Sequence, residues 1–213
     1  RALVCSDIDG DGQDDVLVGA SSFENTGRGY VFFDVFNLAA NATITGVSGG
    51  GLFGDAIAAT STVAVVGEKQ SAPSGRLFIF STATLLADGP PLPSTAATVV
   101  IEAVAETGSL FGGSLSIAQS TSGSDFLVVG ARESYLSCER CGQVYVFDLD
   151  ALVALGGTHD TSQAIATFVP ETTNVINQNL GTYVAMYDVN GDGLPDVVAS
   201  NKKGVHYFQQ VRN

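Results

Sequence analysis

The chain repeats one order of segments four times, and this repeat restricts the fold more than any other feature of the sequence. In each copy, an apolar segment ends in a small residue, and a polar link leads to a glycine and an aromatic segment. The apolar segments are DVLVGA, VAVVGE, FLVVGA and DVVAS, at residues 15–20, 63–68, 126–131 and 196–200. The aromatic segments are GYVFF, GRLFIF, GQVYVF and GVHYF, at residues 29–33, 75–80, 142–147 and 204–208. Their β-branched and aromatic residues show no helical period, so these segments are predicted to be strands.

Two further segments complete each predicted unit. A first strand with a glycine near its start precedes the apolar segment in three units, at residues 52–59, 110–118 and 179–188. A weaker fourth strand follows the aromatic segment, at residues 42–47, 97–104 and 164–169. The second strands are apolar on both faces, which is typical of sheets that are covered on both sides. Four-stranded units that cover each other's faces predict an all-β fold, a β-propeller, with a β-sandwich as the alternative.

We expect one domain of 213 residues with blades at 1–48, 49–105, 106–170 and 171–213. The first unit lacks its Phe-Gly start, and the fourth ends after its third strand. Two arrangements are therefore open: a compact four-bladed ring with an incomplete last blade, or part of a larger ring. Arg1 stands at the start without an initiator methionine or a signal peptide, as expected of a processed protein or a fragment.

Two short acidic segments precede the first and last apolar strands: DIDGDGQDD at 7–15 and DVNGDGLPD at 188–196. Carboxylates this close together repel one another unless a cation binds between them. Hard oxygen donors suit calcium, whereas zinc and copper favour His or Cys. A glycine after the third acidic position permits a sharp turn. The predicted ligands are Asp7, Asp9, Asp11, the backbone carbonyl of Gln13 and Asp15 in the first loop, and Asp188, Asn190, Asp192, the backbone carbonyl of Leu194 and Asp196 in the second.

An EF-hand begins in a similar way, but it needs a bidentate Glu at its twelfth position and a helix on each side. The twelfth positions here are Val18 and Ala199, and a predicted strand follows each loop. Each loop is therefore predicted to close at its ninth position and to lead into a strand. The alternative is an Asp- and Gly-rich surface turn that binds no metal.

Together these motifs resemble FG-GAP repeats, the blades of integrin α-subunit propellers and of related extracellular proteins. The resemblance rests on the Phe-Gly starts at 53–54 and 111–112, on the two acidic loops, and on the VGA…G-x-VYVF continuation at 129–147. It implies a calcium loop between the first and second strands of a blade, and hence two calcium ions as cofactors. The links at 60–62 and 119–125 lack the acidic series, so no metal is expected there. Asp125 alone occupies a closing position and is expected to be a turn residue.

Composition argues against several classes of partner. The net charge is −13 with only nine Lys and Arg residues, so no basic stripe is available for nucleic acid or for an anionic membrane surface. No apolar run approaches the roughly 18 residues that a membrane span requires, so no membrane insertion is expected.

The cysteines and one asparagine bear on the compartment. Cys138 and Cys141 form a C-x-x-C segment without a βαβ pattern or a second ligand pair, so a disulfide is favoured over a redox or zinc site. A disulfide and calcium sites both fit an extracellular or cell-surface location. Cys5 is expected to be a buried free thiol. Asn41 begins an N-x-T glycosylation sequon, which matters if the chain is secreted.

No catalytic motif stands out. The chain lacks G-x-S-x-G and H-E-x-x-H, and His159 and His206 have no ligand spacing. We therefore expect a non-enzymatic, calcium-stabilised module that binds a protein or glycan in adhesion, through polar links at 21–28, 68–75 and 132–141. The alternatives are a structural subunit of an extracellular assembly or, by the FG-GAP resemblance, an accessory propeller of a phospholipase-type enzyme whose catalytic domain lies outside this chain.

Overall fold

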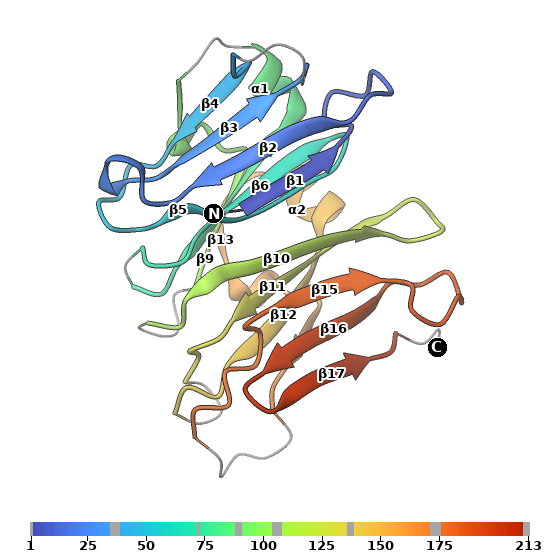
Figure 1. The fold of residues 1–213 in the computed structure, drawn as a ribbon. Coiled ribbons are helices and arrows are strands. Elements are labelled where there is room, and N and C mark those ends of the chain that lie inside the picture. The colour runs from blue at the N-terminus through green and yellow to red at the C-terminus, as the bar shows by residue number, and fades with distance from the viewer. Residues whose placement is uncertain are drawn as a thin grey trace.

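In the residues that the structure describes, the strands form four β-sheets that follow one another along the chain (Figure 1). The structure is a computed structural model that describes residues 2–34, 39–71, 73–87, 91–103, 108–135, 139–170 and 176–210. The fold is all-β, as the sequence predicts, and it also contains short helical segments. None of the helices in these described ranges combines the length and the apolar character that crossing a bilayer would require.

Each sheet is built from antiparallel strands that are consecutive in the predicted order. The first sheet contains β1 (Ala2–Ser6), β2 (Asp15–Ala20), β3 (Arg28–Phe32) and β4 (Ala42–Thr45). The second contains β5 (Phe53–Ala59), β6 (Val63–Glu68), β7 (Arg76–Ser81) and β9 (Val99–Glu102). The third contains β10 (Phe111–Gln119), β11 (Asp125–Ala131), β12 (Gln143–Asp148) and β14 (Ala166–Phe168). The fourth contains β15 (Val184–Tyr187), β16 (Asp196–Asn201) and β17 (Gly204–Phe208).

Insertions after β7 and β12 reach back to the preceding sheet, and the sequence analysis missed both. The first insertion contains α1 (Thr82–Ala87), β8 (Leu92–Pro93) and the 3-10 turn η2 (Ser94–Ala96), and β8 pairs in parallel with β4. The second contains α2 (Leu149–Leu155), β13 (Gly157–Asp160) and the 3-10 turn η3 (Thr161–Gln163), and β13 pairs in parallel with β9. A further 3-10 turn, η1 (Phe23–Asn25), precedes β3. Because β8 and β13 cover the outer edges of β4 and β9, those strands are not left as open edges.

The hydrophobic core is divided into clusters, one at each junction between consecutive sheets. Leu17 and Phe78 belong to the cluster between the first two sheets. Val65 and Phe147 belong to the next cluster, and Val128 and Met186 belong to the third. Strand β6 is buried at every position, whereas β2 alternates between buried and half-buried residues. The expectation of two covered faces thus holds for an inner sheet but not for the first sheet, which lies at one end of the stack in Figure 1.

Contacts between glycines explain two features of the repeat: the small residue at the end of the second strand and the Phe-Gly pair at the start of the next unit. A β-carbon at Gly19 in β2 would lie 2.0 Å from the carbonyl oxygen of Gly54 in β5. The same collision, at 2.1 Å, would occur between Gly67 and Gly112. Backbones of neighbouring sheets therefore meet directly at these points, which only glycine allows. Within the described residues the sheets form an open stack, with the first and fourth at opposite ends (Figure 1).

Candidate metal centres

The first acidic loop connects β1 to β2 and is held by its own aspartates. Asp7 accepts hydrogen bonds from the backbone N–H groups of Gly10 (2.7 Å, to Oδ1) and Gly12 (3.0 Å, to Oδ2). Asp9 accepts one from the backbone of Asp11, and Asp11 accepts one from that of Gln13. Gly10 and Gly12 have φ angles of +80° and +89°, which glycine adopts without strain. These local turns gather the carboxylates toward the inside of the loop.

Asp15 closes this loop from the first position of β2 and is 0 % exposed. Its Oδ2 accepts hydrogen bonds from the backbone N–H groups of Ile8 (2.6 Å) and Asp9 (3.2 Å). Its Oδ1 is buried and has no hydrogen-bond partner among the described residues. Burial raises the pKa of Asp15, and the charges of Asp9 and Asp11 raise it further, although the two backbone hydrogen bonds act in the opposite direction. A buried carboxylate oxygen without a donor is a position that a cation can satisfy.

Three carboxylates meet in this loop. Asp7, Asp9 and Asp15 each offer an oxygen, and these oxygens lie within 4.8 Å of one another. Asp11 and Gln13, which the sequence also predicts as ligands, are exposed and lie outside this group of three. The donor set is entirely oxygen, so the described residues fit a hard divalent cation such as calcium.

The second acidic loop, between β15 and β16, repeats these turns. Asp188 accepts hydrogen bonds from the backbones of Gly191 (2.7 Å) and Gly193 (2.8 Å) at the same spacings as Asp7. The remaining bonds follow the first loop as well: the backbone of Asp192 donates to Asn190, and that of Leu194 donates to Asp192. Two segments more than 170 residues apart in the sequence therefore fold into one loop conformation.

Asp196 corresponds to Asp15 and is also 0 % exposed, but its carboxylate has more partners. Its Oδ2 accepts hydrogen bonds from the hydroxyl of Tyr207 (2.9 Å), from the side-chain amide of Asn190 (3.2 Å) and from the backbone of Val189 (3.2 Å). Its Oδ1 accepts one from the backbone of Gln210 (2.9 Å). Sequence reasoning missed Tyr207, because its role depends on a pairing between strands. Partial loss of hydration raises the pKa of Tyr207, and its hydrogen bond to Asp196 adds to this effect.

Residues of neighbouring units also form hydrogen bonds to both acidic loops. The hydroxyl of Thr82, at the start of α1, donates to the carbonyl of Ile8 (3.0 Å). The hydroxyl of Thr121, in the β10–β11 link, donates to the carbonyl of Gly193 (3.0 Å). No sequence signal marked either threonine, because each contact joins residues that are more than 70 positions apart. Each candidate centre is thus anchored to the adjacent sheet.

The β5–β6 and β10–β11 links carry no acidic series, and the absence of metal there stays a prediction. The expectation that Asp125 is a turn residue is wrong, because Asp125 is the first residue of β11 and pairs in register with Gln119. The Gln119 side chain donates to Asp125 Oδ1 (3.1 Å), which ties the strand ends together.

The other predicted sites have mixed outcomes. Cys5 is a free cysteine but is exposed rather than buried, since alternate residues of β1 face away from the second sheet. Cys138 lies outside the described residues, so its disulfide with the buried Cys141 stays a prediction. Asn41 is exposed, and its Oδ1 accepts a hydrogen bond from the backbone of Phe33 (2.7 Å). Its glycosylation stays a prediction.

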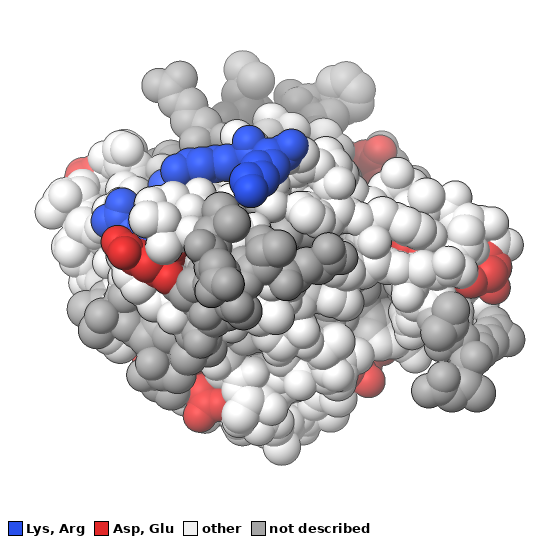
Figure 2. Space-filling model, turned by 90° about the horizontal axis from the view of Figure 1, so that it is seen from below, with Lys and Arg blue, Asp and Glu red and all other residues white. Residues whose placement is uncertain are grey.

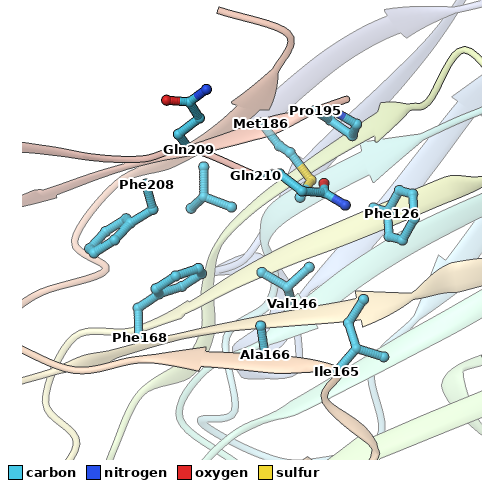
Figure 3. A pocket seen from close by; sticks show the side chains of 11 residues that line it. Phe126, Val146, Ile165, Ala166, Phe168, Met186, Pro195, Phe208, Gln209 and Gln210 are labelled. Carbon is cyan, nitrogen blue, oxygen red and sulfur yellow. The ribbon is translucent and has the colours of Figure 1, made fainter. Parts of the chain in front are cut away.

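An apolar cavity of about 240 Å³ lies between the third and fourth sheets (Figure 3). Phe168 and Phe208 line it, and their rings stack with centroids 4.3 Å apart. Gln209 and Gln210 lie along one side (Figure 3). Among the described residues its lining contains no charged side chain.

Residues 1–32, which comprise β1, the first acidic loop, β2 and β3, match the model of the FG-GAP repeat family. This match supports an FG-GAP assignment for the first unit. No curated protein sequence matches the chain.

Proposed function

We propose that this chain is a calcium-stabilised, extracellular FG-GAP propeller module that binds a protein or glycan partner without catalysing a reaction. The observation that carries the calcium part is the buried Asp15 Oδ1, which lacks a hydrogen-bond partner among the described residues in a loop where three carboxylates converge. The second loop supports it by repeating the same turns. The FG-GAP match of residues 1–32 supports the class of module.

Bound calcium would supply positive charge that offsets repulsion among the carboxylates. Asp7, Asp9 and Asp15 would hold the ion in the first loop, and Asp188, Asn190 and Asp196 would do so in the second. Because each loop joins two consecutive strands, the bound ion would favour the folded sheet. Metal binding and folding would then be linked.

The proposed contact surface is opposite the acidic loops. In Figure 1 the links between β1 and β2 and between β15 and β16 lie on the right, while the links between second and third strands lie on the left. All three predicted contact segments, 21–28, 68–75 and 132–141, belong to the left-hand set in the parts that the structure describes. Polar links on a rigid stack of sheets are the usual place for recognition.

The fourth sheet supports a second candidate, a structural subunit of a larger extracellular assembly. Among the described residues β17 pairs with β16 alone, and its other edge has no partner strand. Val205 is 70 % exposed and Tyr187 is 54 % exposed, so within the described residues the outer face of this sheet presents exposed apolar side chains. Such a face suits another subunit or blade. A pulldown and a glycan array on the isolated chain separate the candidates, since a specific soluble ligand favours recognition.

The calcium proposal is tested by thermal unfolding in chelator and in about 2 mM calcium, a concentration that roughly saturates weak extracellular sites. Calcium should raise the Tm by several degrees, because an ion that binds only the native state stabilises it by mass action. Asp9→Asn should remove part of this rise, since it deletes one charge from the group of three.

Asp14→Asn is the matched control. Asp14 is exposed, lies in the same loop and is not among the converging carboxylates. It should keep the full calcium response. Equal responses in both variants, or identical unfolding of the unchanged chain in calcium and chelator, would count against the proposal.

A further inference from the structure

Four of the nine positively charged residues of this acidic chain line two neighbouring cavities. Two adjoining cavities of about 240 Å³ each share Arg132 and Thr182 in their linings, and we call them together the basic groove. Its charged side chains are the cations Lys69, Arg132, Arg140 and Lys202 and the carboxylates Asp55 and Glu133. The described side chains that line the groove thus sum to a net charge of +2 on a chain whose net charge is −13, and they include four of the nine Lys and Arg residues. Figure 2 shows Lys and Arg gathered along one part of the surface, with one acidic group beside them and the other Asp and Glu residues scattered over the same face.

Several of these cations have unused hydrogen-bonding capacity. Arg132 and Arg140 approach the same carboxylate, Glu133, at 3.6 and 3.9 Å, which is too far for direct hydrogen bonds. Lys202 forms no ion pair within the described ranges, whereas Lys69 is paired with Asp55. Arg140 Nε already donates to the Tyr135 hydroxyl (2.9 Å), so the remaining N–H groups of the two guanidinium groups and the Lys202 ammonium can donate to an incoming anion. Arginine is well suited to this, because its planar donors match a carboxylate or a sulfate.

One amide in the lining of the groove has an oxygen without a hydrogen-bond partner among the described residues. Asn179 lines it, is 8 % exposed, and donates from its side-chain amide to the carbonyl of Arg132 (3.0 Å). Its Oδ1 is buried and accepts no hydrogen bond from the described residues. Asn177, Asn179 and Arg140 all have φ between +51° and +59°, a strained backbone for non-glycine residues that is common at ligand sites.

An exposed aromatic ring borders the same groove. Tyr183 is 74 % exposed and lines the cavity that contains Lys69 and Arg132. Guanidinium donors, an amide acceptor and an exposed tyrosine together suit a hydroxylated ring that bears an acidic group. We propose that the basic groove binds an acidic carbohydrate, a sugar unit that carries a carboxylate or a sulfate. An acidic peptide would use the cations but has few hydroxyl donors for Asn179.

This inference deepens the proposed binding function by naming a ligand class and a site, and it does not depend on the acidic loops. The groove is formed by the second, third and fourth units together, from residues near Lys69, Arg132, Asn179 and Lys202. The overall negative charge disfavours long polyanions, because most of the surface repels them. A short acidic saccharide can occupy the groove without crossing that surface.

The test is calorimetric titration of the full chain in calcium with four probes: a uronate trisaccharide, a sulfated disaccharide, a neutral trisaccharide of matched size and a tetraglutamate peptide. We expect one or both acidic sugars to bind at least tenfold more tightly than the neutral sugar and the peptide. The two acidic probes show whether carboxylate or sulfate is preferred. Arg132→Gln and Lys202→Gln should each weaken binding about tenfold or more, while Lys203→Gln, at the exposed neighbouring position outside the groove lining, should not.

Arg132 and Lys202 have exposed side chains, so both variants should fold, and an unchanged Tm checks this. Equal binding of neutral and acidic sugars, tighter binding of the peptide, no binding of either acidic sugar, or no effect of both groove variants would overturn the carbohydrate assignment. A protein partner captured by pulldown in that case would leave the broader binding function standing. An unfolding temperature that does not respond to calcium would contradict the calcium sites in the acidic loops, and it would leave the carbohydrate assignment unaffected.

Discussion

Asp15 and Asp196 close corresponding loops, yet their carboxylates have different surroundings. Asp15 has one oxygen without a partner in the described structure, whereas both oxygens of Asp196 accept hydrogen bonds. A buried charge that lacks donors is costly, and a cation removes that cost. We therefore infer that the first loop depends more on bound calcium than the second does.

Asparagine substitutions test this difference. In chelator, Asp15→Asn should change the Tm little, because it removes a buried charge with an unsatisfied oxygen. Asp196→Asn should lower the Tm by several degrees in chelator, because its amide would oppose the donors of Gln210 or Tyr207, and hydrogen bonds to charged groups contribute about 1.5–3 kcal/mol. With calcium present, both variants should be less stable than the unchanged chain. Equal losses for the two variants in chelator would contradict the inference.

Glu68 is a second buried carboxylate, at the end of β6, and it is 0 % exposed. Burial raises its pKa above the ordinary value of 4.5, although Arg76 and the nearby Ser48 and Ser71 favour the charged form. Because the folded-state pKa is raised, the part of the folding stability that depends on neutral Glu68 is fully present below about pH 4.5. This part is lost as the pH rises through the folded-state pKa.

Glu68→Gln should therefore raise the Tm relative to the unchanged chain at pH 8 and change it little at pH 4. Differential scanning calorimetry at both pH values measures this. Glu24→Gln, which removes the same charge from an exposed side chain, should show no such pH-dependent gain. A Glu68→Gln variant that is less stable at pH 8 than at pH 4, relative to the unchanged chain, would show that the carboxylate is stabilised rather than penalised.

For single residues, the sequence predicted the positions of the acidic loops but not the residues that form hydrogen bonds to these loops from other elements. The spacing of Asp7, Asp9 and Asp15 in one short segment carries its own signal, because the three residues are local. Thr82, Thr121 and Tyr207 act across long sequence separations, so no local pattern reports them. Asn179 and Lys202 were missed for the same reason, since three units contribute to one groove, whereas Lys69, Arg132 and Arg140 lie in the predicted contact segments 68–75 and 132–141.

The strand is the element that the sequence predicts best in this chain. The four second strands and their aromatic partners lie within one or two residues of their predicted ranges, because β-branched runs between glycines are a strong local signal. The insertions that contain α1 and α2 were missed because their short apolar segments resemble strand or loop sequence. They become helical where Leu85, Leu149 and Leu152 can bury against the sheets.

The glycine contacts between sheets give a prediction for the strands themselves. Gly19 in β2 and Gly29 in β3 are paired in register, but only Gly19 abuts the backbone of the next sheet. Gly19→Ala should lower the free energy of unfolding by at least about 1–3 kcal/mol, because its methyl group would collide with the Gly54 carbonyl.

Gly29→Ala is the matched control, since its β-carbon would lie 3.8 Å from Ile44, an ordinary contact. Its effect on urea unfolding should stay within about 0.5 kcal/mol of neutral. Similar losses for both variants would mean that strand glycine as such, rather than the junction, governs stability.

In the part of the chain that the structure describes, the molecule is a stack of sheets in which the first and fourth sheets are the two ends, and its two faces differ chemically. Leu3 at one end and Val205 at the other are 66 % and 70 % exposed. The acidic loops lie on one face, and the basic groove lies among links of the opposite set. The repeated segments of the sequence predict that the sheets stack on one another. They do not predict whether the end sheets contact other blades, because such a contact depends on surfaces that several segments form together.

Calcium binding by the two acidic loops is the central claim, and its most direct test is the number of ions bound per chain. Titration calorimetry of the metal-free chain with calcium should give two sites, with one remaining in Asp7→Ala, one in Asp188→Ala and none in the double variant. A chain that takes up no calcium at millimolar concentration, or that keeps both sites in the double variant, would contradict the account.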